Sequence, residues 1–128
     1  GGGNAPNLAS VAKLNEALNN LPQPFDAVIL GMGGDGHTAS YFPGSENLDA
    51  ALAGAGPAVA ITAPDAGEPR ITWTLPRLLA TRSLYLHIEG AEKAETLSRA
   101  LANGEIAEMP VRSVLRQTDK PVHIYWCP

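Results

Sequence analysis

A glycine-rich segment, Leu30 to Ser40, constrains the fold of this chain more than any other feature. It follows the apolar run Ala27–Leu30, which predicts a buried β-strand. Four glycines within the segment let the backbone turn sharply and approach a ligand closely. Because ligands in open α/β sheets bind beyond the carboxyl ends of the strands, Asp35 and His37 near the end of this turn predict a site for proton transfer.

The same segment also fits the dinucleotide-binding fingerprint G-x-G-x-x-G, through Gly31, Gly33 and Gly36. That fingerprint requires a long helix after the third glycine and an acidic residue about 20 residues further on. Pro43-Gly44 stops a helix within about two turns of the third glycine. No acidic residue follows the next apolar run before Asp65. We therefore expect neither a dinucleotide nor another cofactor to bind here.

The segment resembles the signature of the 6-phosphogluconolactonases, usually written G-M-G-x-D-G-H-T-A-S-x-F-P. Further segments are similar to motifs of that family and occur in the same order; they are Arg70–Pro76, Glu89–Ala94, Pro110–Arg112 and Val122–Trp126. The resemblance runs from about Val11 to Trp126. It implies hydrolysis of 6-phospho-D-glucono-1,5-lactone to 6-phosphogluconate in the oxidative pentose phosphate pathway, with this phosphorylated sugar lactone as the expected partner.

The resemblance covers only the second half of a typical lactonase. The earlier half of such enzymes carries a Ser/Gly-rich sugar-phosphate loop and an arginine-bearing loop, and neither has a counterpart in this sequence. We therefore expect a C-terminal part of a lactonase/isomerase-type domain, with little or no activity alone. Its expected partner is the missing N-terminal half or a second copy. Residues 1–7 are expected to be a linker or a cloning remnant, and 8–128 a single α/β domain.

Composition excludes several classes of function. The chain has 128 residues, a formal net charge of −4 and 9 Lys and Arg residues, so we expect no nucleic acid partner. No apolar stretch approaches the about 20 residues of a membrane span, and no charged-then-apolar leader is present. The single cysteine, Cys127, cannot form an internal disulfide, which favours a reducing, cytoplasmic setting.

Hydrophobic periodicity predicts helices that alternate with strands. The expected helices cover residues 8–21, 38–42, 76–79, 94–101 and 110–115, and the expected strands cover 27–30, 58–61, 71–74, 84–88 and 122–126. Residues 64–69 are expected to form a loop. Glu95 and Arg99 are expected to pair on the outer side of their helix. The alternation predicts a Rossmann-like parallel sheet with helices on both faces.

Lactone hydrolysis needs an activated water molecule and stabilisation of the negative charge on the carbonyl oxygen. His37 is the candidate base, because an imidazole is the natural base at neutral pH, and the resemblance assigns the catalytic role to this histidine. Asp35 is the candidate for orienting it. The backbone N–H groups of Gly33, Gly34 and Gly36 are candidate oxyanion donors. No metal site is expected, because the three histidines show no H-x-x-x-H spacing and no cysteine pair occurs.

Lys93 is the main candidate for binding the substrate phosphate. It lies in the first turn of the helix that Gly90 opens, where a cation opposes the helix dipole. A phosphate at that helix end would offset the cost, and the resemblance places the family's phosphate-binding lysine here. Arg70 is a second candidate for the substrate site. Solvated positions are expected for Arg112 and Arg116.

Two alternative functions remain open from the sequence. The first is a glucosamine-6-phosphate deaminase or isomerase, whose motif places a glutamate five residues after the histidine. Phe42 occupies that position, and Glu46 lies nine residues after the histidine. The second alternative is a non-enzymatic sugar-phosphate sensor, which would not need both Asp35 and His37.

Overall fold

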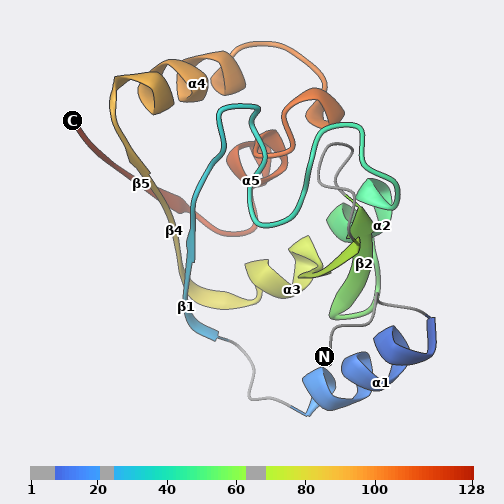
Figure 1. Ribbon diagram of the computed structural model, residues 1–128. Helices are drawn as coiled ribbons and strands as arrows, with labels where there is room; N and C mark the ends of the chain where they lie inside the picture. The colour runs from blue at the N-terminus through green and yellow to red at the C-terminus, as the bar shows by residue number, and fades with distance from the viewer. Residues whose placement is uncertain (1–7, 21–24, 63–68) are drawn as a thin grey trace.

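The computed structural model describes residues 8–20, 25–62 and 69–128 (Figure 1). In chain order, the elements are α1 (Leu8–Asn19), β1 (Phe25–Leu30), α2 (Leu48–Ala53), β2 (Ala58–Thr62), β3 (Pro69–Trp73), α3 (Leu75–Leu79), β4 (Thr81–Glu89), α4 (Ala91–Leu101), the 3-10 helix η1 (Ile106–Glu108), α5 (Arg112–Arg116) and β5 (Val122–Cys127). Within the described ranges, no helix combines the length and the apolar character that crossing a lipid bilayer requires.

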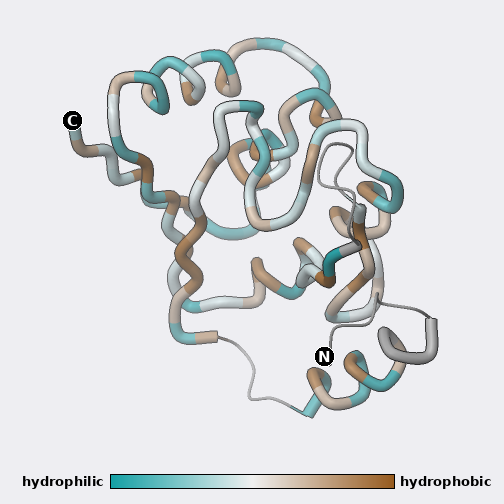
Figure 2. The backbone as a smooth tube through the Cα atoms, viewed as in Figure 1, coloured by the Kyte–Doolittle hydropathy of each residue, from teal (hydrophilic) through white to brown (hydrophobic). Residues whose placement is uncertain are grey.

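The central sheet has the strand order β1-β4-β5, and both pairs are parallel. Leu86 of β4 is in register with Leu30 of β1 on one side and with Ile124 of β5 on the other. Figure 2 shows strongly hydrophobic stretches along these central strands. The predicted parallel α/β sheet is therefore confirmed.

In the described residues, the helices of the two crossovers lie on one face of this sheet. The strand order advances in one direction, and right-handed crossovers that advance in one direction place their helices on the same face. The burial of β4 agrees, since Leu84, Leu86 and Ile88 are buried while the alternating residues are exposed or half-buried.

The predicted strands 58–61 and 71–74 exist as β2 and β3, but they pair with each other in a separate antiparallel hairpin. Ala60 is in register with Ile71. A short connection permits antiparallel pairing, whereas a parallel pair needs a crossover of about a dozen residues or more. The predicted loop 64–69 lies outside the described residues, apart from Pro69, which begins β3.

The predicted helix 38–42 is wrong. Thr38 and Tyr41 form an isolated antiparallel bridge around a tight turn, and Ala39 has a φ of 50°, which a right-handed helix does not allow. Tyr41 is fully buried, and its hydroxyl donates to the Trp73 carbonyl oxygen at 2.6 Å. The helix of this region is α2, whose buried Leu48 follows the turn by several residues.

Arg112 is buried, and the prediction that it is solvated is wrong. It is 5% exposed, and its guanidinium donates to the carbonyl oxygens of Arg99, Ala100 and Glu105 at 2.9 to 3.1 Å. These bonds tie the end of α4 to the start of α5. Arg116 is exposed, as predicted.

Candidate active site

The glycine loop that follows β1 is closed by its own backbone. The Gly36 N–H donates to the Gly33 carbonyl oxygen at 3.0 Å, and the Gly33 N–H donates to the His37 carbonyl oxygen at 2.9 Å. Gly36 has a φ of +85°, and a Cβ there would lie 2.7 Å from the Cβ of Met109. Only glycine satisfies both conditions, so this position fixes the turn that presents Asp35 and His37.

The imidazole of His37 lies directly against Gly33. A Cβ added at Gly33 would overlap the Cε1 and Nδ1 atoms of that ring, whereas a Cβ at Gly34 would meet nothing within 4 Å. The two adjacent glycines therefore have different roles. Gly33 makes room for the histidine, and Gly34 faces open space.

Asp35 and His37 are in direct contact. One carboxylate oxygen, Oδ1 of Asp35, lies 2.6 Å from Nδ1 of His37 and also accepts the His37 backbone N–H at 3.0 Å. An ionised carboxylate can only accept, so Nδ1 carries the proton; in the neutral ring, the lone pair is then on Nε2. The side chains of His37 and Asp35 are 33% and 54% exposed, so both are partly accessible to solvent.

The pKa of Asp35 is lower than its ordinary value of 3.8. Partial burial alone would raise this pKa, but hydrogen bonds from the His37 N–H and imidazole, together with the charge of the imidazole, outweigh that effect. Asp35 is therefore a carboxylate at neutral pH, and its Oδ1 contacts Nδ1 of the His37 ring.

The N–H groups of the three glycines proposed as oxyanion donors differ in their hydrogen bonds. The N–H groups of Gly33 and Gly36 already donate to carbonyl oxygens within the loop, so a substrate cannot use them without breaking the turn. Among the described residues, no acceptor is found for the N–H of Gly34, which is exposed. The sequence could not separate these glycines, because the difference arises from the path of the turn.

Two cations of α4 reach the glycine loop. Nζ of Lys93 donates to the Met32 carbonyl oxygen at 2.6 Å, which leaves two of its three N–H groups for another ligand. Nη2 of Arg99 lies 3.4 Å from the Gly34 carbonyl oxygen and 3.2 Å from Oγ1 of Thr96. The predicted pairing of Arg99 with Glu95 is not found among the ion pairs of the described residues.

Sequence reasoning missed Arg99 as a site residue. The signal was present, because residues 93, 96 and 99 follow each other at a spacing of three and so lie on one side of a helix. Lys93, already a candidate, marks the side that faces the loop.

Phe42 lies between Arg70 and His37. The guanidinium carbon of Arg70, on β3, lies 5.4 Å from the centre of the Phe42 ring, within the range of a cation–π contact. The centre of the same ring lies 4.8 Å from that of His37. The β2-β3 hairpin thus brings Arg70 next to the loop. The sequence identified Phe42 only as the residue that replaces a glutamate.

These features define an α/β protein with an oriented histidine at the end of a parallel strand and with cations beside it. The chain belongs to the family described as glucosamine-6-phosphate isomerases/6-phosphogluconolactonase, whose model matches residues 4–126.

Relatives with known names support the same assignment. The 6-phosphogluconolactonase of Rhizobium meliloti (strain 1021) is 50% identical over 122 residues, which are 94% of this chain and 53% of that protein. That of Mesorhizobium japonicum is 41% identical over 121 residues, 93% of this chain and 50% of that protein. The crystal structure of a 6-phosphogluconolactonase from Shewanella baltica OS155 superposes with a TM-score of 0.89 at 40% identity and covers 94% of this chain and 52% of that chain. The chain thus spans about half the length of these relatives.

Proposed function

We propose that this chain supplies the catalytic base of a 6-phosphogluconolactonase, which hydrolyses 6-phospho-D-glucono-1,5-lactone to 6-phosphogluconate in the oxidative pentose phosphate pathway. The observation that carries the proposal is the 2.6 Å contact between Asp35 and His37 on the glycine loop. The names of relatives up to 50% identical support this choice of substrate.

In this mechanism, Nε2 of His37 removes a proton from a water molecule as its oxygen attacks the lactone carbonyl carbon. The Gly34 N–H stabilises the oxyanion that forms. The bond between the carbonyl carbon and the ring oxygen then breaks, and the imidazolium returns its proton to that oxygen, which leaves as a hydroxyl group. The carboxylate of Asp35 holds the ring and stabilises its positive charge. The scheme uses no cofactor.

The cations around the loop are proposed to bind the phosphate of the substrate. Lys93 has two free N–H groups and lies in the first turn of α4, where the helix dipole favours an anion. Arg99 lies on the same side of the helix. Arg70 approaches from the hairpin across Phe42.

The partner proposed for this chain is the remaining half of a lactonase-type protein. The open face of the central sheet exposes Ile29 at 72% and Tyr125 at 58%, and large apolar exposure of this kind is typical of interfaces. The Asp35–His37 pair is also partly exposed, so enclosure of the substrate is expected to come from the other half. We further propose a cytoplasmic setting, which the free, exposed thiol of Cys127 supports.

Phe42 argues against the deaminase or isomerase alternative. Its ring stacks beside His37, where that activity would need a carboxylate. A sensor that only binds sugar phosphates would gain nothing from an imidazole held by a carboxylate with Nε2 free.

The test is a chimera in which this chain replaces the matching half of the Rhizobium meliloti relative. We expect the chimera to accelerate the loss of 6-phosphogluconolactone above its spontaneous hydrolysis by orders of magnitude, and this chain alone to do so little. A folded chimera with no lactonase activity would contradict the proposal. The need for a partner would be contradicted if the activity of this chain alone were within about threefold of that of the chimera. Such a difference is well under the tenfold that about 1.4 kcal/mol represents.

A further inference from the structure

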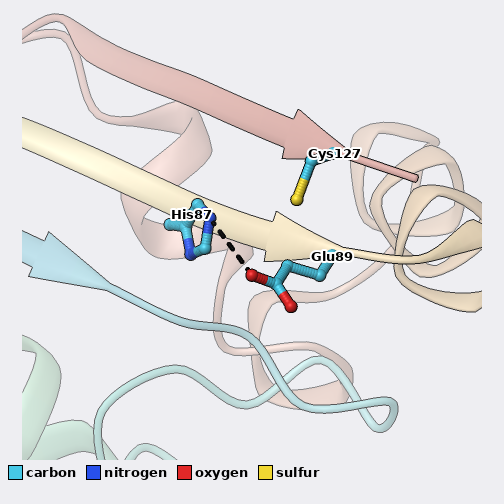
Figure 3. Close-up of side chains that lie close together, drawn as sticks. All are labelled: His87, Glu89 and Cys127. Atoms are coloured by element: carbon cyan, nitrogen blue, oxygen red, sulfur yellow. Dashed lines mark ion pairs between the residues drawn. The ribbon is translucent and has the colours of Figure 1, made fainter.

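Three potential metal ligands meet at the carboxyl ends of two neighbouring strands. His87 and Glu89 come from β4, and Cys127 comes from the end of β5 (Figure 3). One ligand atom from each residue can be chosen so that all three lie within 4.8 Å of one another. None of these residues takes part in the proposed lactonase mechanism.

The strand register places the three side chains on one face. Glu89 is paired directly with Cys127 in the parallel ladder, and His87 precedes Glu89 by two residues. Residues two apart in a strand point to the same side of the sheet. This side is the open face, so the arrangement comes from the backbone of two adjacent strands and not from a flexible loop.

The spacing of the ligand atoms is close to that of a metal centre. A tetrahedral zinc ion with bonds of about 2.0–2.3 Å separates its ligand atoms by about 3.3–3.8 Å. Nε2 of His87 and Oε1 of Glu89 are already 3.7 Å apart. Their side chains are 50% and 68% exposed, and Cys127 is also exposed, so small rotations can bring the remaining distances into range.

The type of ligand selects the cation. Zinc accepts thiolate, imidazole and carboxylate ligands together, whereas magnesium and calcium prefer oxygen alone. We propose that His87, Glu89 and Cys127 bind one Zn²⁺ ion, with water in the fourth position. On binding, the Cys127 thiol releases its proton to solvent, and a sulfur–metal bond forms. No metal site was expected from the sequence, because the histidines lack H-x-x-x-H spacing and no cysteine pair occurs. Cys127 lies 40 positions after His87 in the printed sequence, so spacing alone does not reveal the cluster.

This site joins the ends of β4 and β5 on the open face. The present link there is backbone pairing, together with the hydrogen bond from the Trp126 indole to the Gly90 carbonyl oxygen at 2.8 Å. A bound ion would add metal–ligand bonds between the two strands, so Zn²⁺ should raise the thermal stability of the chain.

The experiment titrates the reduced 128-residue chain with Zn²⁺ by calorimetry and with Co²⁺ by absorption spectroscopy. We expect one ion per chain and the near-ultraviolet absorption of a cobalt–thiolate bond. Cys127→Ser should abolish that absorption, and Cys127→Ser and His87→Ala should each weaken Zn²⁺ binding at least about tenfold. All these side chains are exposed, so circular dichroism should show unchanged folding.

Two histidine variants are matched controls. His123→Ala removes an exposed histidine of the same face, and His37→Ala removes the histidine of the glycine loop, which also contacts a carboxylate. Both should bind Zn²⁺ as the unchanged chain does. The proposal is overturned if Zn²⁺ does not bind, if binding survives both Cys127→Ser and His87→Ala, if either control variant loses it, or if one ion bridges two chains.

Discussion

The two faces of the central sheet differ although the same strands build both. On the covered face, Leu84 and Leu86 of β4 have no exposed surface. On the open face, Ile29 of β1 is 72% exposed. Alternate residues of one strand point to opposite faces. Each strand therefore contributes side chains both to the buried core and to the open face. The chain therefore buries one face of the sheet by itself and leaves large apolar side chains exposed on the other.

The glycine loop is held in place without the open face of the sheet. It is held by contacts within residues 33–37, by Met109 beneath Gly36, and by Lys93 from α4. None of these contacts involves the open face. The contact between Asp35 and His37 is therefore formed within this chain.

The largest expected effect tests the two faces directly. Leu86→Ala should lower the free energy of unfolding of the chain by about 2–5 kcal/mol, because it leaves a cavity in the core. Ile29→Ala should change it by no more than about 0.5 kcal/mol, because the side chain is mostly exposed. Urea unfolding measures both. Similar losses for the two variants would mean that the open face is already covered in solution.

The sequence predicted the features that depend on local chemistry. Gly33 leaves room for the His37 ring, and Gly36 has a left-handed φ. Both requirements are local, so the loop could be recognised from the sequence without knowledge of the fold. The strand order could not be recognised in this way, because it depends on how distant segments of the chain pair. The same holds for the β2-β3 hairpin, since a short apolar run does not reveal its partner.

Buried polar contacts were also beyond the sequence. Arginine usually lies on the protein surface, so the burial of Arg112 was not expected. The three carbonyl oxygens that accept hydrogen bonds from its guanidinium explain this burial. The cluster of His87, Glu89 and Cys127 likewise depends on the register of two strands. Lys93 was identified from its place at a helix start, but its bond to the Met32 carbonyl was not foreseen.

A second prediction compares the two adjacent glycines of the loop in the active chimera. Gly33→Ala should lower kcat/KM about 10²-fold, since the added Cβ displaces the His37 ring and a small misplacement of a catalytic group costs about that much. Gly34→Ala meets no atom within 4 Å and should keep most of the activity. Equal losses would show that the ring position is not what Gly33 secures.

A third prediction concerns the phosphate. In the chimera, Lys93→Ala should raise KM for the phosphorylated lactone about tenfold or more, because a charged hydrogen bond contributes about 1.5–3 kcal/mol. It should change KM for the unphosphorylated lactone little. Steady-state kinetics on both substrates separates the two effects. An equal loss on both would indicate that Lys93 acts only by holding the loop through the Met32 carbonyl oxygen.

The smallest expected effect concerns the pH dependence of stability. Because the pKa of folded Asp35 lies below its ordinary value, ionised Asp35 stabilises the fold above about pH 4, and this contribution is lost as the pH falls through the folded pKa. The side chain is 54% exposed, so the contribution should stay below about 1 kcal/mol. Unfolding of Asp35→Asn at pH 6 and at pH 2 measures it. The variant should lose stability relative to the unchanged chain at pH 6 more than at pH 2; the opposite order would contradict the account.

The most direct test of the central claim is the turnover of the chimera with His37→Ala. The imidazole is the base in the proposed mechanism, and removal of a general base lowers rates by roughly 10²–10⁴-fold. The side chain is partly exposed, so thermal unfolding should change little. The predicted result is a fall in kcat/KM of that size with unchanged thermal unfolding. A variant that keeps more than about half of the activity would contradict the account, because such a loss corresponds to well under about 1 kcal/mol in the activation barrier.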